Sequence, residues 1–253
     1  MDQFFVNPLA IEALAPRGVL RAAINFGNPI LASKDFRTGE PYGVSVDLAR
    51  ELARRLGLAL RLVGYEAAGK VTAAACADEW DVAFLAIDHE RGSSMEYSAP
   101  YVLIEGAYLV PERSVIRDIR DVDQAGNRVV VGQGSAYDLF LSRMMRHAQI
   151  VRTATSPQVT ETMLAEGYEV AAGVKQQLEA DMRRLPGGRL LDGSFMSICQ
   201  AMAVPKGRLR AIEYLVEFVE MMKASGFVAA SLKRHRIGGA AIAPVRSIVK
   251  GAS

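Results

Sequence analysis

A nearly continuous apolar run between Asp81 and Asp88 limits the fold of this chain more than any other segment. Such a run suits a strand that is covered on both faces, as in the parallel sheet of an α/β protein. Arg91 follows where that strand ends, and ligands of open α/β sheets gather at the carboxyl ends of the strands. Its planar guanidinium keeps its charge and matches a carboxylate or phosphate in bidentate fashion. Arg91 is therefore the candidate anchor for an anionic ligand; the alternative is a surface arginine paired with Asp88, Glu90 or Glu96.

Strand and helix patterns alternate along the first part of the chain. Val19 to Ile24 predicts a buried strand, and Leu58 to Val63 predicts a second one. Between them, Ser45 is expected to cap a helix with one apolar face that ends at Gly57. This is a βαβ unit, whose crossover should be right-handed. A further helix over residues 70–77 leads into the apolar run described above.

The same alternation recurs in the second half, where RVVVGQGSAYDLF predicts a strand, a glycine turn and a helix. The turn lacks the third glycine of a dinucleotide fingerprint, and no P-loop lysine follows it. Ser135 instead opens the helix, whose free N–H groups and dipole favour an anion site at Ser135 and Ala136. The alternative is an ordinary serine cap without a ligand. Further strands are expected at 151–155 and 168–174, and further helices at 156–166 and 176–184.

Two extended segments are predicted to cross between these two groups of elements, one after Tyr101 and one within SFMSICQAMAVP. Residues 209–236 predict two helices of the first group, and residues 7–14 predict a short N-terminal helix. The glycine- and alanine-rich tail after Ile237 is expected to be flexible or to contact a partner.

The composition excludes several classes of function. The 30 Lys and Arg are spread among 28 Asp and Glu, for a formal net charge of +2, so no basic stripe supports nucleic-acid or membrane-surface binding. No apolar run reaches the ~18 residues of a membrane span. Cys76 and Cys199 lack CxxC spacing and are expected to be buried free thiols. The histidines show no zinc-ligand pattern, and we predict neither a metal nor a cofactor.

Five stretches that span about Leu20 to His235 carry a family resemblance: LRAAINFG, PYGVSVDLARELARRLG, DVAFLAIDHERGSSMEYSAPY, RVVVGQGSAYDLF and KASGFVAASLKRH. In this order they resemble the bacterial extracellular solute-binding proteins of family 3, which deliver amino acids and similar solutes to ABC importers. The resemblance implies an α/β fold of the type II periplasmic-binding-protein kind, in which two βα lobes are joined by two hinge crossings. It places residues 1–103 and 200–253 in lobe 1 and residues 104–199 in lobe 2, with hinges near 102–105 and 198–200.

The resemblance also assigns binding positions. In the family, the positions that match Arg91, Ser135 and Ala136 hold the carboxylate of the ligand, so that one lobe contributes the arginine and the other the helix amides. The segment after the first strand lines the cleft, and an aromatic residue near the end of the second strand often packs on the ligand. These positions correspond to Asn25, Phe26, Asn28 and Tyr65, for which a plain turn or a structural tyrosine is the alternative.

Two positions depart from the family pattern. Ala86 stands five residues before Arg91, where these receptors usually have a serine or threonine. Val174, with Lys175 beside it, stands where an aspartate usually pairs with the ammonium of an amino acid. An ammonium buried without its counter-charge would cost several kcal/mol. We therefore hypothesise an anionic ligand without an obligatory ammonium, such as a keto acid or aromatic acid, although a shifted register at Glu169 would restore a carboxylate.

The resulting prediction is the solute-binding component of an ABC importer, which closes on an amino acid or related carboxylate and works in the periplasm. Its partners would be that solute and the membrane subunits of the importer. The N-terminus shows no signal-peptide pattern, which leaves open either a removed signal or a cytoplasmic ligand sensor. A second alternative is a dehydratase-like enzyme on the same scaffold, with His89, Asp88 and Glu169 as candidate acids and bases and no readable catalytic set.

Overall fold

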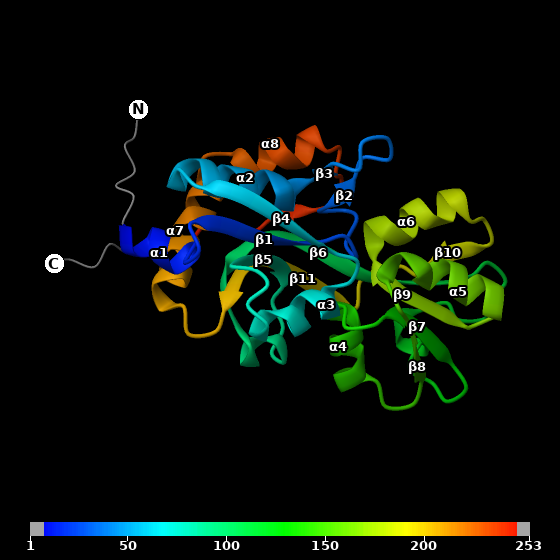
Figure 1. The fold of residues 1–253 in the computed structure, drawn as a ribbon. Helices are drawn as coiled ribbons and strands as arrows, with labels where there is room; N and C mark the ends of the chain where they lie inside the picture. Colours follow the sequence, from blue (N-terminus) through cyan, green and yellow to red (C-terminus); the bar gives the residue numbers. More distant parts are fainter. Residues whose placement is uncertain (1–7, 247–253) are drawn as a thin grey trace.

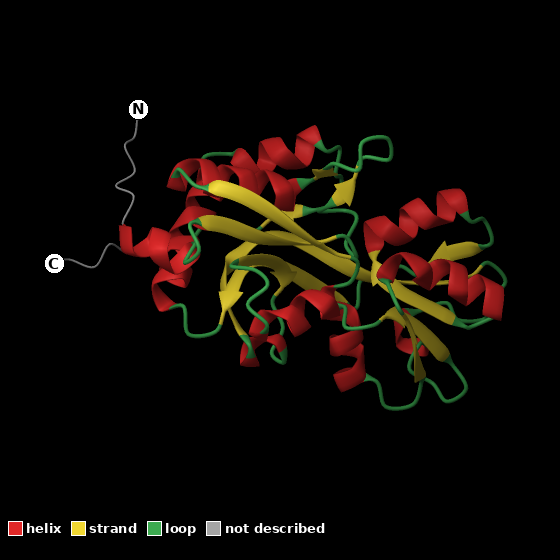
Figure 2. Ribbon diagram, in the orientation of Figure 1, coloured by secondary structure: helices red, strands yellow, loops and turns green. Residues whose placement is uncertain are grey.

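The computed structural model describes residues 8–246, in which a large mixed sheet runs through the molecule and β2 (Ser33–Lys34) pairs with β3 (Pro41–Tyr42) in a separate two-stranded sheet (Figure 1). The strand order of the large sheet is β4-β1-β5-β11-β6-β9-β7-β8, with β10 and β12 also paired to β6. Helices cover both faces of this sheet, and the elements gather into a larger and a smaller lobe (Figures 1 and 2). The fold is α/β, as predicted.

The larger lobe begins with the predicted βαβ unit. Strand β1 (Val19–Asn25) pairs in parallel with β4 (Ala59–Tyr65) and β5 (Val82–Ala86), and all five residues of β5 are buried. Helix α2 (Val44–Leu56) connects β1 to β4, and α3 (Ala68–Ala73) precedes β5.

The predicted cap of α2 was wrong. Its N-cap is Gly43, whereas Ser45 lies buried inside the helix. Gly43 has φ 121°, and a Cβ at this position would collide with the carbonyl oxygen of Leu31. A close backbone approach therefore fixes the start of this helix, and only glycine fits there. The C-terminal end of α2 is as predicted, because Gly57 caps it in the left-handed conformation with φ 64°.

Two long antiparallel strands carry the chain between the lobes. Strand β6 (Met95–Pro111) pairs with β11 (Met196–Pro205) along most of its length. The second half of β6 also pairs with β9, and the second half of β11 pairs with β5. The predicted lobe boundaries at 103/104 and 199/200 fall inside these two strands.

The smaller lobe repeats the alternation of strand and helix. Strand β7 (Arg128–Gly132) pairs in parallel with its neighbours β8 (Gln149–Thr153) and β9 (Val170–Val174). The connections contain α4 (Ala136–Met144), α5 (Val159–Glu166) and α6 (Lys175–Arg184), and β10 (Gly188–Leu190) adds to β6.

Helices α7 (Leu209–Ala224) and α8 (Phe227–Arg234) return to the larger lobe, as predicted. The predicted N-terminal helix is α1 (Pro8–Leu14), which packs against α7 with Leu14 fully buried, while position 7 lies outside the described residues. Within residues 8–246, no helix is both long and apolar enough to cross a membrane.

The tail beyond α8 is ordered along the crossing, in contrast to the expected flexibility. Strand β12 (Ala241–Ile242) pairs with Val102 and Leu103 of β6. Lys223 Nζ donates to the carbonyl oxygen of Pro244 at 2.9 Å, and the backbone N–H of Arg246 donates to a carboxylate oxygen of Glu220 at 2.8 Å. Both polar partners of the tail thus belong to α7, and residues 247–253 lie outside the described part.

The cysteines also differ from the prediction. Cys76 is exposed and Cys199 is half-buried, although both are free thiols as expected. Cys76 ends a short 3-10 turn in which the side chains of Ala74 and Ala75 face the core, so the third residue of the turn faces solvent.

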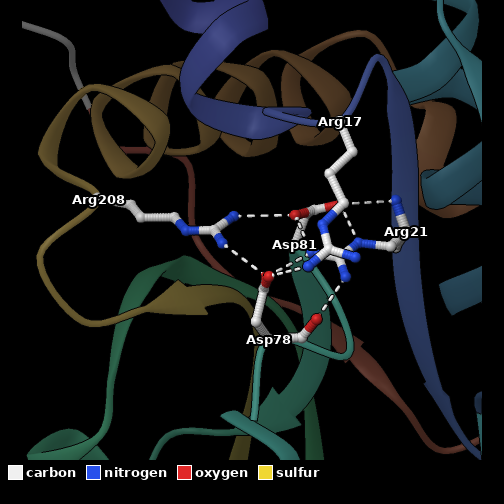
Figure 3. Close-up of polar contacts among 5 residues, drawn as sticks. All are labelled: Arg17, Arg21, Asp78, Asp81 and Arg208. Carbon is white, nitrogen blue, oxygen red and sulfur yellow. Dashed lines mark hydrogen bonds and ion pairs between the residues drawn. The ribbon is translucent and has the colours of Figure 1, made fainter. Parts of the chain in front are cut away.

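A charged cluster closes the end of the larger lobe where β1 and β5 begin (Figure 3). Asp81 is fully buried and accepts hydrogen bonds from the side chains of Arg21 and Arg208. Asp78 pairs with Arg21 at 2.7 Å and also with Arg17. This cluster joins β1, the turn before β5 and the turn before α7, and it lies at the opposite end of the strands from the site described next.

Candidate functional site

A cavity that is partly open to solvent lies between the lobes. It forms where β1, β5 and β9 end and where α4 and α6 begin. The carboxyl ends of the parallel strands from both lobes thus meet around one space, as is typical of ligand sites in open α/β sheets. Its lining includes Asn25, Asn28, Ala86, Arg91, Ser135, Ala136, Tyr137, Ser156, Val174, Gln177, Ile198 and Gln200.

Arg91 is a buried cation at this cavity, with only 2% of the residue exposed. Its Nη1 donates to the carbonyl oxygen of Ala86 at 3.0 Å, and its Nη2 donates to that of Gly134 at 2.6 Å, whereas the buried Nε has no partner. Within residues 8–246, no carboxylate forms an ion pair with it. Burial lowers the pKa of Arg91, because desolvation disfavours the charged form. Arg91 is thus not the surface ion-pair residue of the alternative interpretation.

The start of α4 faces the cavity, but side chains of the same segment already accept hydrogen bonds from some of its backbone N–H groups. Ser135 is the N-cap and accepts from the backbone N–H of Asp138 at 3.0 Å. The N–H of Ser135 donates to Gly132 at 3.1 Å, and that of Gly134 donates to the carboxylate of Asp138 at 2.8 Å. Of the two predicted amide donors, Ala136 is the one whose N–H, as the first of the helix, has no intrahelical acceptor.

The predicted asparagines lie on the wall of the larger lobe. Asn25 Oδ1 accepts from the backbone N–H of Gly27 at 3.0 Å, which fixes the amide plane. Asn28 Oδ1 is buried without a hydrogen-bond partner, so it can accept a hydrogen bond from a ligand. Ala86 and Val174 line the cavity as buried apolar residues, 4% and 9% exposed.

Phe26 and Tyr65 do not line this cavity. The ring of Phe26 packs against Gly64, and Lys34 Nζ lies 4.3 Å from the ring centroid. The hydroxyl of Tyr65 donates to Glu79 at 2.8 Å, and burial together with this hydrogen bond raises its pKa to about 12. Both aromatic side chains therefore have structural contacts outside the cavity.

Four polar residues of the cavity were not predicted from the sequence. Tyr137 and Ser156 belong to the smaller lobe, and burial raises the pKa of Tyr137. Gln177 lies in the first turn of α6, where its Nε2 donates to Asp181 at 2.9 Å, and Gln200 lies on β11 with 6% exposure. The position of Gln177 directly after a strand end is the signal that could have identified it.

The shifted register that would have placed Glu169 in the site is wrong. Glu169 precedes β9, at the opposite end of this strand from Val174, and it accepts from Arg128 at 2.6 and 2.8 Å. Among the described residues, no carboxylate lines the cavity. Its charged group is Arg91, surrounded by neutral amides, hydroxyls and apolar side chains. Within the described residues, no group of His, Cys, Asp and Glu is arranged to hold a metal ion.

The lobes contact each other directly beside the cavity. Arg91 of the larger lobe donates to Gly134 of the smaller lobe, and Arg143 of α4 pairs with Asp88 at 2.7 Å. Gly134 also approaches α3 so closely that a Cβ on it would lie 2.9 Å from the Cα of Gly69. Its φ of 67° likewise favours glycine. The two lobes are therefore in direct contact at the edge of the cavity.

Comparisons with known proteins agree with this geometry. A mutant of ArgBP from T. maritima superposes with a TM-score of 0.77 at 22% identity, over 90% of this chain and 99% of that chain. The solute receptor for L-cysteine of Neisseria gonorrhoeae gives 0.78 at 18% identity, over 91% and 94%. AncCDT-1, an ancestral amino-acid-binding protein and a precursor of cyclohexadienyl dehydratase, gives 0.75 at 19%, over 88% and 98%. At these identities the similarity establishes the fold. The family model for bacterial extracellular solute-binding proteins, family 3, matches residues 26–237, and the chain belongs to this family.

Proposed function

We propose that this protein is the solute-binding component of an ABC importer and that it binds a small organic carboxylate between its lobes. The observation that carries this proposal is Arg91, a buried guanidinium that lines the cavity and that has neither a partner for its Nε nor a paired carboxylate among residues 8–246. Removing an uncompensated buried charge from water costs several kcal/mol. A carboxylate ligand would supply the missing negative charge and accept charge-assisted hydrogen bonds from Arg91 and the N–H of Ala136.

The ligand class is limited further by the uncharged remainder of the cavity. Because no carboxylate of the described part of the chain lines it, an α-ammonium would be buried there without a counter-charge, and the side chain of Val174 offers it no hydrogen bond. The amides of Asn28, Gln177 and Gln200 suit a neutral hydroxyl, keto or amide group. We therefore favour a monocarboxylate with an uncharged polar group over an amino acid.

The role in import is supported by the family and by related structures. One solved relative is a substrate-binding protein of an amino acid ABC transporter, and the family is described as extracellular. We infer from this that the protein acts outside the cytoplasm and docks on importer membrane subunits. Fractionation of the native host distinguishes this location from the cytoplasmic sensor: recovery in the periplasmic or surface fraction supports import, and recovery in the cytoplasm supports the sensor.

We also propose that the protein binds its ligand without converting it chemically. The acids and bases considered for a dehydratase do not line the cavity: His89 is exposed, Asp88 is paired with Arg143, and Glu169 is paired with Arg128. Recovery of an unchanged ligand after prolonged incubation with the protein supports a receptor, whereas a chemically altered product supports the enzyme.

The test of the binding proposal is a thermal-shift screen with keto acids, hydroxy acids, aromatic acids, dicarboxylates and amino acids. A ligand present at a hundred times its Kd stabilises the folded state by about 2.7 kcal/mol, which shifts the Tm by several degrees. The shift should disappear in Arg91→Ala and persist in Arg117→Ala, an exposed arginine of the smaller lobe. A shift that survives in Arg91→Ala contradicts the assigned anchor, and the absence of any shift across the panel contradicts the ligand class.

A further inference from the structure

Two buried side-chain atoms on the cavity wall have no hydrogen-bond partner within residues 8–246. They are Nε of Arg91 and Oδ1 of Asn28. Nε is a donor, whereas Oδ1 is an acceptor. A ligand carboxylate satisfies the donor and leaves the acceptor unpaired, because an ionised carboxylate has no proton to donate. The ligand therefore needs a second group of the opposite hydrogen-bonding character.

The backbone of Asn28 is held in the turn that follows β1. Its carbonyl oxygen accepts from the N–H groups of Leu31 and Ala32, both at 3.1 Å. Its own N–H donates to the carbonyl oxygen of Asn25 at 3.3 Å. Gly27 lies against the segment after β4, where a Cβ on it would be 2.9 Å from a backbone carbonyl oxygen. The Asn28 side chain thus extends from a fixed backbone, and a ligand has to match its position.

Two other amides of the cavity wall already have partners. Oδ1 of Asn25 accepts from the backbone N–H of Gly27 at 3.0 Å, and Nε2 of Gln177 donates to a carboxylate oxygen of Asp181 at 2.9 Å. These bonds fix the orientation of each amide within its own lobe. The amide oxygen of Asn28 has no such bond, so it is the acceptor that a ligand can pair.

We propose that the ligand is a hydroxy acid whose carboxylate binds Arg91 and whose hydroxyl donates to Oδ1 of Asn28. This inference rests on the proposed function, since it concerns the same cavity and the same anchor. A hydroxyl supplies the donor that the buried oxygen needs. A keto group supplies only another acceptor and leaves Oδ1 unpaired, which costs binding free energy. Asn28 is thus the residue that distinguishes a hydroxy acid from the corresponding keto acid.

The ammonium of an amino acid also carries N–H donors, but it brings a charge into the cavity. Asn28 is neutral, and no carboxylate of the described residues lines this space. One amide oxygen accepts a hydrogen bond from an ammonium without supplying the counter-charge that offsets its desolvation. A hydroxyl forms the same hydrogen bond without that cost. The hydroxy acid should therefore bind more tightly than both the keto acid and the amino acid of the same carbon skeleton.

The test is isothermal titration calorimetry with L-lactate, D-lactate, pyruvate, L-alanine and propionate, and with the larger pair mandelate and phenylglyoxylate. Within each set the carboxylate is constant, so differences in affinity report the second group. We expect at least one lactate enantiomer, or mandelate, to bind at least about fivefold more tightly than its keto acid, which corresponds to about 1 kcal/mol for one unpaired buried acceptor. Keto acids that bind as tightly as the hydroxy acids in both sets overturn the proposal.

The assignment to Asn28 is tested by Asn28→Leu, which removes the amide and nearly keeps the size of the side chain. The ratio of hydroxy-acid to keto-acid affinity should fall to about one in this variant. Gln149→Leu is the matched control, because it makes an amide-to-leucine change at an exposed position of β8 outside the cavity. Its ratio should equal that of wild type. A wild-type ratio that persists in Asn28→Leu shows that another group accepts the hydroxyl, and rejects the role of Asn28.

A crystal structure of wild type with the preferred hydroxy acid provides a readout that does not depend on the folding of a variant. We expect the ligand hydroxyl within hydrogen-bond distance of Oδ1 of Asn28, and a hydroxyl bonded elsewhere overturns the assignment. The two proposals also fail in different ways. If wild type binds no acid of the series or of the wider panel, the ligand class fails. If acids bind and this binding is lost in Arg91→Ala, but hydroxy acids have no advantage, the carboxylate function stands and the role of Asn28 is rejected.

Discussion

Arg21 binds Asp81 through three hydrogen bonds: the backbone N–H and Nε donate to Oδ2 at 3.0 and 2.9 Å, and Nη2 donates to Oδ1 at 2.8 Å. Arg208 adds a further bond to the same carboxylate at 3.0 Å (Figure 3). Asp81 has no exposed surface, and the side chain of Arg21 is 7% exposed. The pair therefore links the starts of β1 and β5 inside a desolvated region.

Asp81→Asn should destabilise the protein by about 3 kcal/mol, because removing one partner leaves the buried Arg21 without its main counter-charge. Chemical denaturation measures this loss. Asp118→Asn is the matched control, since Asp118 forms an ion pair with the exposed Arg120 and should change stability little. Equal effects of the two substitutions would mean that burial does not govern the strength of this pair.

The stability should also depend on pH through Asp81. Burial raises the pKa of this carboxyl, but the hydrogen bonds from Arg21 and Arg208 outweigh it and hold the pKa below its ordinary value. A lowered folded-state pKa stabilises the protein above the unfolded-state pKa of about 3.9, and this stabilisation is lost as the pH falls through the folded-state value. Denaturation midpoints measured from pH 6 to pH 2 should fall less steeply in Asp81→Asn than in wild type. An equally steep fall in the two proteins would contradict the assignment of this pH dependence to Asp81.

Local sequence patterns predicted the elements and the position of Arg91, because both depend on residues close in the chain. The run after Asp81 forms β5, and Arg91 lies where it ends, at the interlobe cavity. Ser135 caps α4 as predicted for the same reason. The binding roles of these residues remain predictions.

Features that depend on tertiary contacts were not predictable in this way. Gly43 replaces Ser45 as the cap of α2 because of its approach to Leu31, which is distant in sequence. Gln200 lines the cavity because β11 pairs with β5, and Tyr65 lies outside the cavity, where its hydroxyl donates to Glu79. Composition indicated neither side-chain direction nor the pairing of β12 with β6.

Truncation after Ile237 should lower the free energy of unfolding by at least about 2 kcal/mol. It removes β12 and the carbonyl oxygen of Pro244, which accepts a hydrogen bond from Lys223. It also uncovers the buried ion pair that Lys223 forms with Glu220 at 2.9 Å. Truncation after Arg246 is the control, because it keeps all the tail contacts described above. Thermal and urea denaturation of both proteins provide the comparison; a truncation at Ile237 as stable as its control would show that the tail contributes no net stability.

Val174→Asp should change the ligand class of the cavity. The substitution adds a carboxylate at a 9% exposed wall position, in a space whose charged group is otherwise Arg91. An α-ammonium would then have a counter-charge, so amino acids should produce thermal shifts that wild type does not show, while simple monocarboxylates should bind more weakly through repulsion. Val174→Asn has nearly the same shape without the charge, and it should not gain amino-acid binding. If wild type already binds amino acids as tightly as Val174→Asp does, the ammonium is recognised by neutral groups, and the absence of a carboxylate does not set the specificity of this site.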